Sequence, residues 1–404
     1  MNNSEWKEYK LGEVTDSCLG KMLDAKKNKG MPQPYLANVN VRWGSFDLDN
    51  LPLMRFEDDE NERYGLKYGD IVLCEGGEPG RCAIWKNQIP NMKIQKALHR
   101  IRCHENLDYQ YLYYYLLWAG KRGLLEAYFT GTTIKHLPGD KLKIIPIKVP
   151  SIATQKEIAK ILSALDDKIE LNNAINRNLE EQAQALFKNW FIDFAPFGGK
   201  MPEDWKEIPL KECCSAITDG VHNTVVDDPN GDFYLLSCKN IKGGLLSIGT
   251  DERRISKETF NKLRRRTKLA KGDILLSSVG TVGEMLLLNR SPDNIEFQRS
   301  VAIIRANLDI VSPHFLYNSL ISQKESIVNA AHGAVQQCIF LSDIGDFKTI
   351  LPAEEYMEKY TDLVVPYFNE ITKNQDECQY LKAIRDAMLP KLMSGEIDAD
   401  KIAV

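Results

Sequence analysis

The chain has 404 residues, of which 43% are hydrophobic and 27% charged, and its formal net charge is −4. This length suits two or three domains, and the ordinary composition excludes a chain that is disordered over its whole length. No run of eighteen apolar residues and no apolar signal core occur, so we expect a cytoplasmic protein without a transmembrane helix. Because the net charge is negative, nucleic-acid binding would require Lys and Arg residues that cluster locally.

The first globular segment is expected over residues 1–150 and should be rich in β-structure. Short apolar runs bounded by turn residues predict strands within 70–74, 82–85 and 99–103, and a helix is predicted from Leu107 to Tyr128. The glycine-rich stretch 75–80 lacks the Lys-Ser/Thr pair of a phosphate-binding loop, which favours a tight turn.

A long amphipathic helix is predicted from Thr154 to Phe194, within a helical region of residues 151–194. Thr154 and Glu157 form a capping-box pattern, and residues 195–199 should end the helix. Forty residues at ~1.5 Å each make a rod of about 60 Å, which suits a spacer. The apolar seam follows a three-four spacing and consists of Ile158, Ile161, Leu162, Leu165, Ile169, Ile175, Leu179, Ala183, Leu186 and Trp190.

The second globular segment, residues 195–352, repeats the first with a period of ~200 residues. Strands are predicted within 273–278, 284–289 and 300–305, a turn at 280–283, and a helix from Pro313 to Ala331. The matching positions include Trp6 and Trp205, Asn40 and Asn240, Asp70 and Asp273, Gln95 and Gln298, and Gly131 and Gly333. One structural plan therefore occurs twice.

A second long helix is predicted from Glu354 to Leu389, within residues 353–404. Pro366 should bend this helix or mark its start. Asn172 and Asn374 occupy equivalent seam positions, where buried amides can fix the register, and solvent exposure of both is the alternative. The other seam residues are Tyr360, Leu363, Val364, Tyr367, Ile371, Cys378, Leu381, Ile384 and Met388.

These elements predict an α+β fold in which two β-rich mixed α/β domains are joined by two long antiparallel helices. Such pairing would hold one globular half at each end of a shared coiled-coil stalk and create an internal pseudo-twofold repeat.

Motifs of known catalytic or metal centres do not occur in the sequence. There is no G-x-S-x-G, no H-E-x-x-H and no dinucleotide-binding fingerprint. The six histidines are scattered, and the nine cysteines are odd in number, without a C-x-x-C pair. We therefore expect reduced thiols and neither a metal nor a catalytic site.

Basic residues gather in two stretches. The larger contains Arg253, Arg254, Lys257, Lys262, Arg264, Arg265, Arg266, Lys268 and Lys271, and the smaller contains Lys21, Lys26, Lys27 and Lys29. Such a stretch is either a solvated face or a binding site for phosphates.

Several long motifs resemble those of the specificity subunits of type I restriction-modification systems. The stretch 158–191 is similar to the first helical region of that family, and 385–397 is similar to the close of its second. Residues 218–224 are similar to an opening loop of its recognition domains, and residues 20–24, 35–48 and 74–85 together are similar to another type of recognition domain. The resemblance covers nearly the whole chain.

This resemblance implies a DNA-binding subunit without a catalytic site, which brings two methyltransferase subunits and ATP-dependent restriction subunits to a two-part DNA target. S-adenosylmethionine, ATP and magnesium would belong to those partners, and no cofactor to this chain. Two alternatives are a coiled-coil scaffold that binds proteins and a fused modification enzyme.

Polar and basic loop residues are the best candidates for DNA contacts, because their side chains can bond base edges and neutralise phosphates. Each of them could also be structural. The candidates are Lys26, Lys27, Arg42, Gln95, Lys96, Lys135 and His136 in the first domain and His222, Asn223, Lys239, Arg253, Arg254, Gln298, Arg299, Gln336 and Gln337 in the second. Trp190 and Phe191 are candidates for partner binding.

Overall fold

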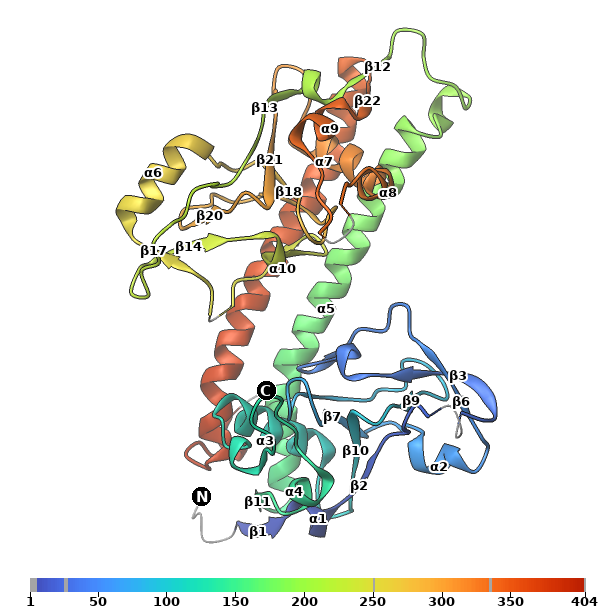
Figure 1. The fold of residues 1–404 in the computed structure, drawn as a ribbon, viewed down its shortest axis with the longest axis vertical. Helices are drawn as coiled ribbons and strands as arrows, with labels where there is room; N and C mark the ends of the chain where they lie inside the picture. Colours follow the sequence, from blue (N-terminus) through green and yellow to red (C-terminus); the bar gives the residue numbers. More distant parts are fainter. Residues whose placement is uncertain (1–5, 25–27, 250, 334–335, 403–404) are drawn as a thin grey trace. The chain divides into compact units, whose positions relative to one another are not determined.

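The computed structural model describes residues 6–24, 28–249, 251–333 and 336–402. The chain divides into two compact units of mixed α and β structure (Figure 1). Unit 1 comprises residues 1–170 and 378–404, and unit 2 comprises residues 171–377. Each unit therefore contains one of the predicted globular segments together with parts of both long helices.

The centre of unit 1 is a four-stranded antiparallel sheet in the order β2-β10-β7-β8. A three-stranded sheet, β6-β3-β9, and the pairs β4-β5 and β1-β11 surround it. The strands are β1 Lys7–Lys10, β2 Thr15–Leu19, β3 Met31–Leu36, β4 Val41–Arg42, β5 Ser45–Phe46, β6 Leu53–Phe56, β7 Ile71–Cys74, β8 Cys82–Ile84, β9 Lys93–Ile94, β10 Leu98–Cys103 and β11 Pro146–Val149. The helices are α1 Leu11–Val14, η2 Asn38–Asn40, α2 Glu60–Tyr64, α3 Tyr109–Lys121, η3 Glu126–Tyr128 and α4 Gly139–Lys143, with η7 Ala399–Lys401 near the other end of the chain.

Unit 2 repeats this plan. Its sheets are β13-β21-β18-β19, β17-β14-β20, β15-β16 and β12-β22, the same order of strands as in unit 1. The strands are β12 Lys206–Pro209, β13 Cys214–Asp219, β14 Phe233–Leu236, β15 Ile241–Lys242, β16 Leu245–Leu246, β17 Arg254–Ile255, β18 Ile274–Ser277, β19 Met285–Leu287, β20 Ile295–Phe297, β21 Val301–Ala306 and β22 Lys348–Leu351. The helices are η4 Ala195–Phe197, η5 Leu210–Cys213, η6 Cys238–Asn240, α6 Lys257–Thr267, α7 Pro313–Ser322, α8 Lys324–Asn329 and α9 Leu341–Asp346.

Every predicted strand and both late helices are present, although the second helix is broken. The first predicted helix is shorter than expected, since α3 ends at Lys121 and η3 follows separately, and the second is divided at Gln323 into α7 and α8. All nine cysteines are free, as expected. Within the described ranges, no group of His, Cys, Asp or Glu side chains could hold a metal ion, and no helix is long and apolar enough to cross a membrane.

The two long helices are α5, Ile152–Phe191, and α10, Glu354–Met393. The predicted capping box at Thr154 is wrong, because α5 starts two residues earlier and the Ser151 hydroxyl accepts the Thr154 amide at 3.2 Å. Pro366 does not start α10, which runs through it without interruption.

The two helices pack antiparallel within each unit. In unit 1, Arg385 donates to Asp166 at 2.5 Å, and Cys378 donates to the Ile169 carbonyl at 3.8 Å. In unit 2, residues of increasing number along α5 contact residues of decreasing number along α10. Asn172 donates to Glu377 at 2.7 Å, Asn374 donates to Asn176 at 2.9 Å, and the Tyr360 hydroxyl donates to the Ala183 carbonyl at 3.2 Å.

The predicted seam is wrong at two positions. Ile175 is 37% exposed and Leu363 is 45% exposed, whereas Asn172, Asn176 and Asn374 are buried. The interpretation of Asn172 and Asn374 as buried amides is therefore confirmed, although each bonds to a different partner and not to the other.

Candidate nucleic-acid interface

In unit 1, backbone hydrogen bonds gather four loop segments at one edge of the four-stranded sheet. We call this set loop cluster 1; it consists of residues 20–21, 75–80, 95–97 and 130–137. The Glu75 amide donates to the Ala97 carbonyl at 2.9 Å, the Leu137 amide donates to the Glu75 carbonyl at 2.7 Å, and the Lys96 amide donates to the Lys21 carbonyl at 2.9 Å.

Unit 2 builds the same arrangement, loop cluster 2, from residues 220–223, 278–283, 298–300 and the described part of 332–339. The Ser278 amide donates to the Ser300 carbonyl at 2.9 Å, and the Ile339 amide donates to the Ser278 carbonyl at 2.9 Å. The Arg299 amide donates to the Val221 carbonyl at 3.0 Å. Sequence-distant loops therefore meet in the same way twice.

The repeated glycines of the sequence have a physical role in these clusters. A Cβ atom on Gly20 would lie 2.4 Å from the Ile94 carbonyl oxygen, and one on Gly220 would lie 2.1 Å from that of Phe297. Gly131 and Gly333 have φ angles of +89° and +104° and turn tightly against the carbonyls of Ile134 and Gln336. Larger residues would separate the loops.

Ten of the sixteen DNA-contact candidates lie in the two clusters. Cluster 1 contains Gln95, Lys96, Lys135 and His136, and cluster 2 contains His222, Asn223, Gln298, Arg299, Gln336 and Gln337. Lys96 and Arg299 are exposed at the tips of equivalent turns. Lys26 and Lys27 lie outside the described residues.

The other four candidates lie outside the clusters, and each contacts nearby groups of its own unit. Arg42 on β4 lies 3.5 Å from Asp47, and Lys239 on η6 lies 3.1 Å from Glu252. Arg253 forms a 2.6 Å ion pair with Asp227. Arg254 is half-buried and lies over the Tyr234 ring, with 5.3 Å between the guanidinium carbon and the ring centroid. Arg254 therefore stabilises the β14-β17 pair and is a weaker candidate than the sequence indicates.

The two partner-binding candidates differ in exposure. Phe191 is 1% exposed and packs among the aromatic rings of the unit 2 core, so it is a core residue and not a partner surface. Trp190 is only partly buried, and it alone keeps surface for a partner.

Two buried residues of unit 1, whose structural roles the sequence did not predict, support loop cluster 1. Buried Lys21 donates to the Arg55 carbonyl at 2.9 Å and pairs with Glu60 at 2.5 Å. Burial opposes ionisation of Glu60, but the hydrogen bond and charge of Lys21 prevail and lower the pKa of Glu60. His99 is also buried, which lowers its pKa, and its Nε2 bonds the Leu137 carbonyl at 2.8 Å. The sequence indicated Lys21 only as part of a basic stretch and as the neighbour of the motif glycine at residue 20. It did not indicate that Lys21 and His99 would be buried and bonded to backbone carbonyls.

Known proteins similar to this chain include specificity subunits and domains of type I restriction systems. Residues 3–181 match the family described as type I restriction modification DNA specificity domain. The chain is 27% identical over 349 residues to the type I restriction enzyme MjaIX specificity subunit of Methanocaldococcus jannaschii, across 83% of this chain and 79% of that relative. Residues 3–181 therefore carry a domain of this kind, and the similarity to curated specificity subunits extends over most of the chain.

A second relative matches along its whole length. The HindI specificity subunit of Haemophilus influenzae is 24% identical over 472 residues, which covers 98% of this chain and all of the relative (100%). The fold is similar to the crystal structure of a type I restriction-modification S subunit from M. genitalium, with a TM-score of 0.55, 18% identity and 97% coverage of each chain. Specificity subunits recognise DNA and are not catalytic.

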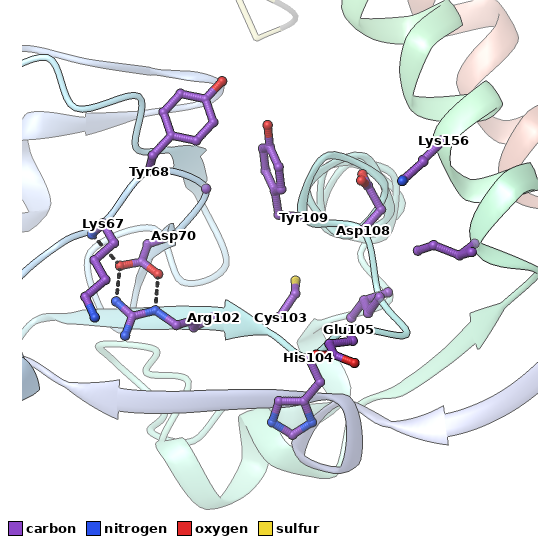
Figure 2. Close-up of a pocket in the computed structure, with 13 residues that line it drawn as sticks. Lys67, Tyr68, Asp70, Arg102, Cys103, His104, Glu105, Asp108, Tyr109 and Lys156 are labelled. Carbon is purple, nitrogen blue, oxygen red and sulfur yellow. Dashed lines mark hydrogen bonds and ion pairs between the residues drawn. The ribbon is translucent and has the colours of Figure 1, made fainter.

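Several polar side chains that line one cavity of unit 1 have structural roles. This cavity has a volume of about 380 Å³. Among the side chains that line it (Figure 2), Asp70 accepts two hydrogen bonds from Arg102, both at 2.7 Å, and one from the Lys67 amide at 2.7 Å. Asp108 accepts the Gln110 amide at 2.9 Å and so caps α3. Burial raises the pKa of the nearby Cys103 thiol to about 12, which keeps it protonated and unreactive.

Proposed function

We propose that this specificity subunit reads a two-part, asymmetric DNA target, with loop cluster 1 on one part and loop cluster 2 on the other. One observation supports the proposal above all: the two units build the same loop arrangement but fill it with different polar side chains. Gln95 and Gln298 are the same residue, but Lys96 occupies the place of Arg299, Lys135 that of Gln337, and His136 that of Cys338. Because different donors select different base edges, the two half-targets should differ in sequence.

In this proposal the domains are residues 1–150 and 195–352, and the helical regions 151–194 and 353–404 form a coiled-coil stalk that sets their spacing. The chain binds double-stranded DNA, and two methyltransferase subunits and the restriction subunits assemble on it. Those partners bind S-adenosylmethionine, ATP and magnesium. The exposed part of Trp190 is the candidate contact for a methyltransferase subunit.

The test compares two matched double variants, Gln95→Ala with Lys96→Ala and Gln298→Ala with Arg299→Ala. Each variant is assembled with its methyltransferase subunits, and methylated adenines are mapped on a random-sequence DNA library. Because one bidentate base contact is worth about 1–3 kcal/mol, each variant should lose roughly 5- to 150-fold preference in one half of the target only.

Lys373→Ala on α10 is the control, because this lysine is exposed and lies on neither cluster. An unchanged motif in both double variants, or loss of both halves in either one, contradicts the assignment of one cluster to each half. A wild-type complex without any sequence preference would instead favour a protein scaffold.

A further inference from the structure

Helix α6 in unit 2 has one apolar face and one basic face. Phe260, Leu263 and Thr267 are buried, and the Ser256 hydroxyl caps the helix by accepting the Thr259 amide. On the outer face, Lys262 and Arg265 are exposed, as is Lys268 directly after the last turn. The helix therefore presents a row of cations to solvent.

Two arginines of α6 are used inside the unit. Arg264 forms an ion pair with Glu296, which is fully buried at 0% exposure. Arg264 also donates to the Pro292 and Ile295 carbonyls, at 2.6 and 2.8 Å. Arg266 donates to the carbonyls of Asp219, at 2.7 Å, and of Gly220. Arg264 thus holds α6 against β20, and Arg266 holds its last turn against loop cluster 2.

The outer cations differ from these two arginines. Among the described residues, no carboxylate lies within 4.0 Å of Lys262, Arg265 or Lys268. The carboxylate of Asp219, whose backbone carbonyl Arg266 bonds, accepts a 2.6 Å hydrogen bond from His222 Nε2. The end of α6 that carries the basic row therefore lies next to the segment that carries His222.

Unit 1 has the opposite charge at the equivalent place. α2 follows β6, as α6 follows β17, and these two strands have the same position in their sheets. The α2 region exposes Asp58, Asp59 and Glu62, and Lys21 pairs with its Glu60. The helix at this place of the repeat is thus basic in unit 2, where it is α6, and acidic in unit 1, where it is α2.

We propose that α6 binds DNA phosphates beside the part of the target that loop cluster 2 reads, and that α2 makes no such contact in unit 1. This inference rests on the proposed function. Phosphates flank every base that a loop can read, and exposed lysine and arginine side chains bind them with release of counterions. Unit 2 then provides most of the salt-dependent binding, and unit 1 relies on its loops.

The test uses the assembled complex with the triple variant Lys262→Ala, Arg265→Ala, Lys268→Ala. Binding to the target duplex is measured by fluorescence anisotropy between about 50 and 300 mM salt. The slope of log K against log salt should become shallower by up to about 3, since each lost phosphate contact removes roughly 0.9. The methylation motif should not change, because these residues contact no bases.

A control triple variant, Lys206→Ala, Lys359→Ala, Lys373→Ala, removes three exposed lysines of unit 2 that lie on β12 and α10. It should keep the wild-type slope. In the opposite experiment, Asp58→Asn, Asp59→Asn, Glu62→Gln on α2 should change the slope by less than one contact, or about 0.9.

An unchanged slope in the α6 variant overturns the inference, as does a change of equal size in the α2 variant. Loss of complex assembly with an unchanged DNA slope would assign α6 to a protein partner. These outcomes differ from failure of the proposed function, which would appear as a wild-type complex that binds all duplexes equally.

Discussion

At the scale of single residues, the same ion pair supports the sheet of each unit. Asp273 is 1% exposed and accepts Arg305 at 2.7 and 2.6 Å and the Ala270 amide at 2.9 Å. Asp70 and Arg102 repeat this arrangement in unit 1. Each pair joins the turn before one strand to the neighbouring strand.

Arg305→Ala should destabilise unit 2 by roughly 2–3 kcal/mol, because it leaves a buried carboxylate without its cation. Urea unfolding gives the free energy. Arg290→Ala is the matched control: its 2.5 Å pair with Asp376 is exposed on both sides, 44% and 58%, and should be worth less than ~1 kcal/mol. Equal losses from the two variants would show that burial of the partner does not matter.

Glu180 on α5 should make the stability of unit 2 depend on pH. Burial, with a smaller effect of Glu181, raises its pKa to about 7, although Arg177 opposes the shift. Above this pKa the folded protein must hold a buried charge that the unfolded chain solvates. The cost disappears as pH falls through about 7 towards the ordinary value near 4.5, because the folded state takes up its proton first.

Glu180→Gln should therefore be more stable than wild type by about 1–2 kcal/mol near pH 8, and this difference should close near pH 5. Urea unfolding at both pH values measures it. Glu181→Gln, at an exposed neighbouring site, should give no such difference between the two pH values. A constant gap for Glu180→Gln at all pH values would contradict the titration.

Sequence patterns revealed the repeated Gly-Asp turn before β7 and β18 but not the role of its aspartate. The arginine partner lies 32 residues away in both units. Their approach depends on the pairing of β7 with β10 and of β18 with β21, and a linear pattern does not contain that register. In contrast, the motif glycines Gly20 and Gly220 do lie where two loops come into close contact.

At the scale of elements, the helix pair in unit 2 is held by a polar layer within an apolar seam. Asn176 accepts from Asn374, and Asn172 donates to Glu377, while Asn172 Oδ1 and Asn176 Nδ2 are buried without a protein partner. Unpaired buried polar atoms cost stability but penalise any shift of one helix along the other.

The double variant Asn176→Leu, Asn374→Leu should raise the free energy of unfolding by about 1 kcal/mol and weaken the preference for one register. Urea unfolding measures the first effect. Disulfide trapping between cysteines placed on the two helices, in the native and a shifted register, measures the second. Lower stability with an unchanged register would show that the amides are net stabilising.

The apolar spacing rule failed where the amides enter the seam. The buried residues of α5 include Ile169, Asn172, Asn176 and Ala183, so the buried face keeps a three-four spacing only if the asparagines are counted as part of it. The rule selected Ile175, one position away and exposed. Pro366 has no amide hydrogen to donate to the Asp362 carbonyl, one turn earlier in α10. Both residues are on the exposed side of the helix, so water can bond that carbonyl and the helix continues.

At the scale of the whole molecule, the proposed function makes helix length a determinant of target spacing. Seven residues inserted into α5 after Glu170, and seven into α10 before Cys378, keep the seam in phase and add ~10.5 Å. At ~3.4 Å per base pair, the preferred gap between the two half-targets should grow by about three base pairs.

Methylation mapping on a library with varied gaps measures this change, and the same insertion in α5 alone serves as the control. The single insertion should disrupt the pairing of the helices and reduce methylation at every gap. An unchanged preferred gap in the double insertion would show that the helices do not set the spacing.

The core of unit 1 joins two segments that lie far apart in the sequence, one before and one after unit 2. Leu11 and Val14 share it with Leu389, Leu392 and Met393, whereas unit 2 is one uninterrupted stretch. During translation, unit 2 can therefore complete its core while unit 1 still awaits the residues after 377, the reverse of the usual N-terminal-first order. On a ribosome stalled as residue 377 leaves the exit tunnel, a protease should cut within residues 6–150 and spare unit 2.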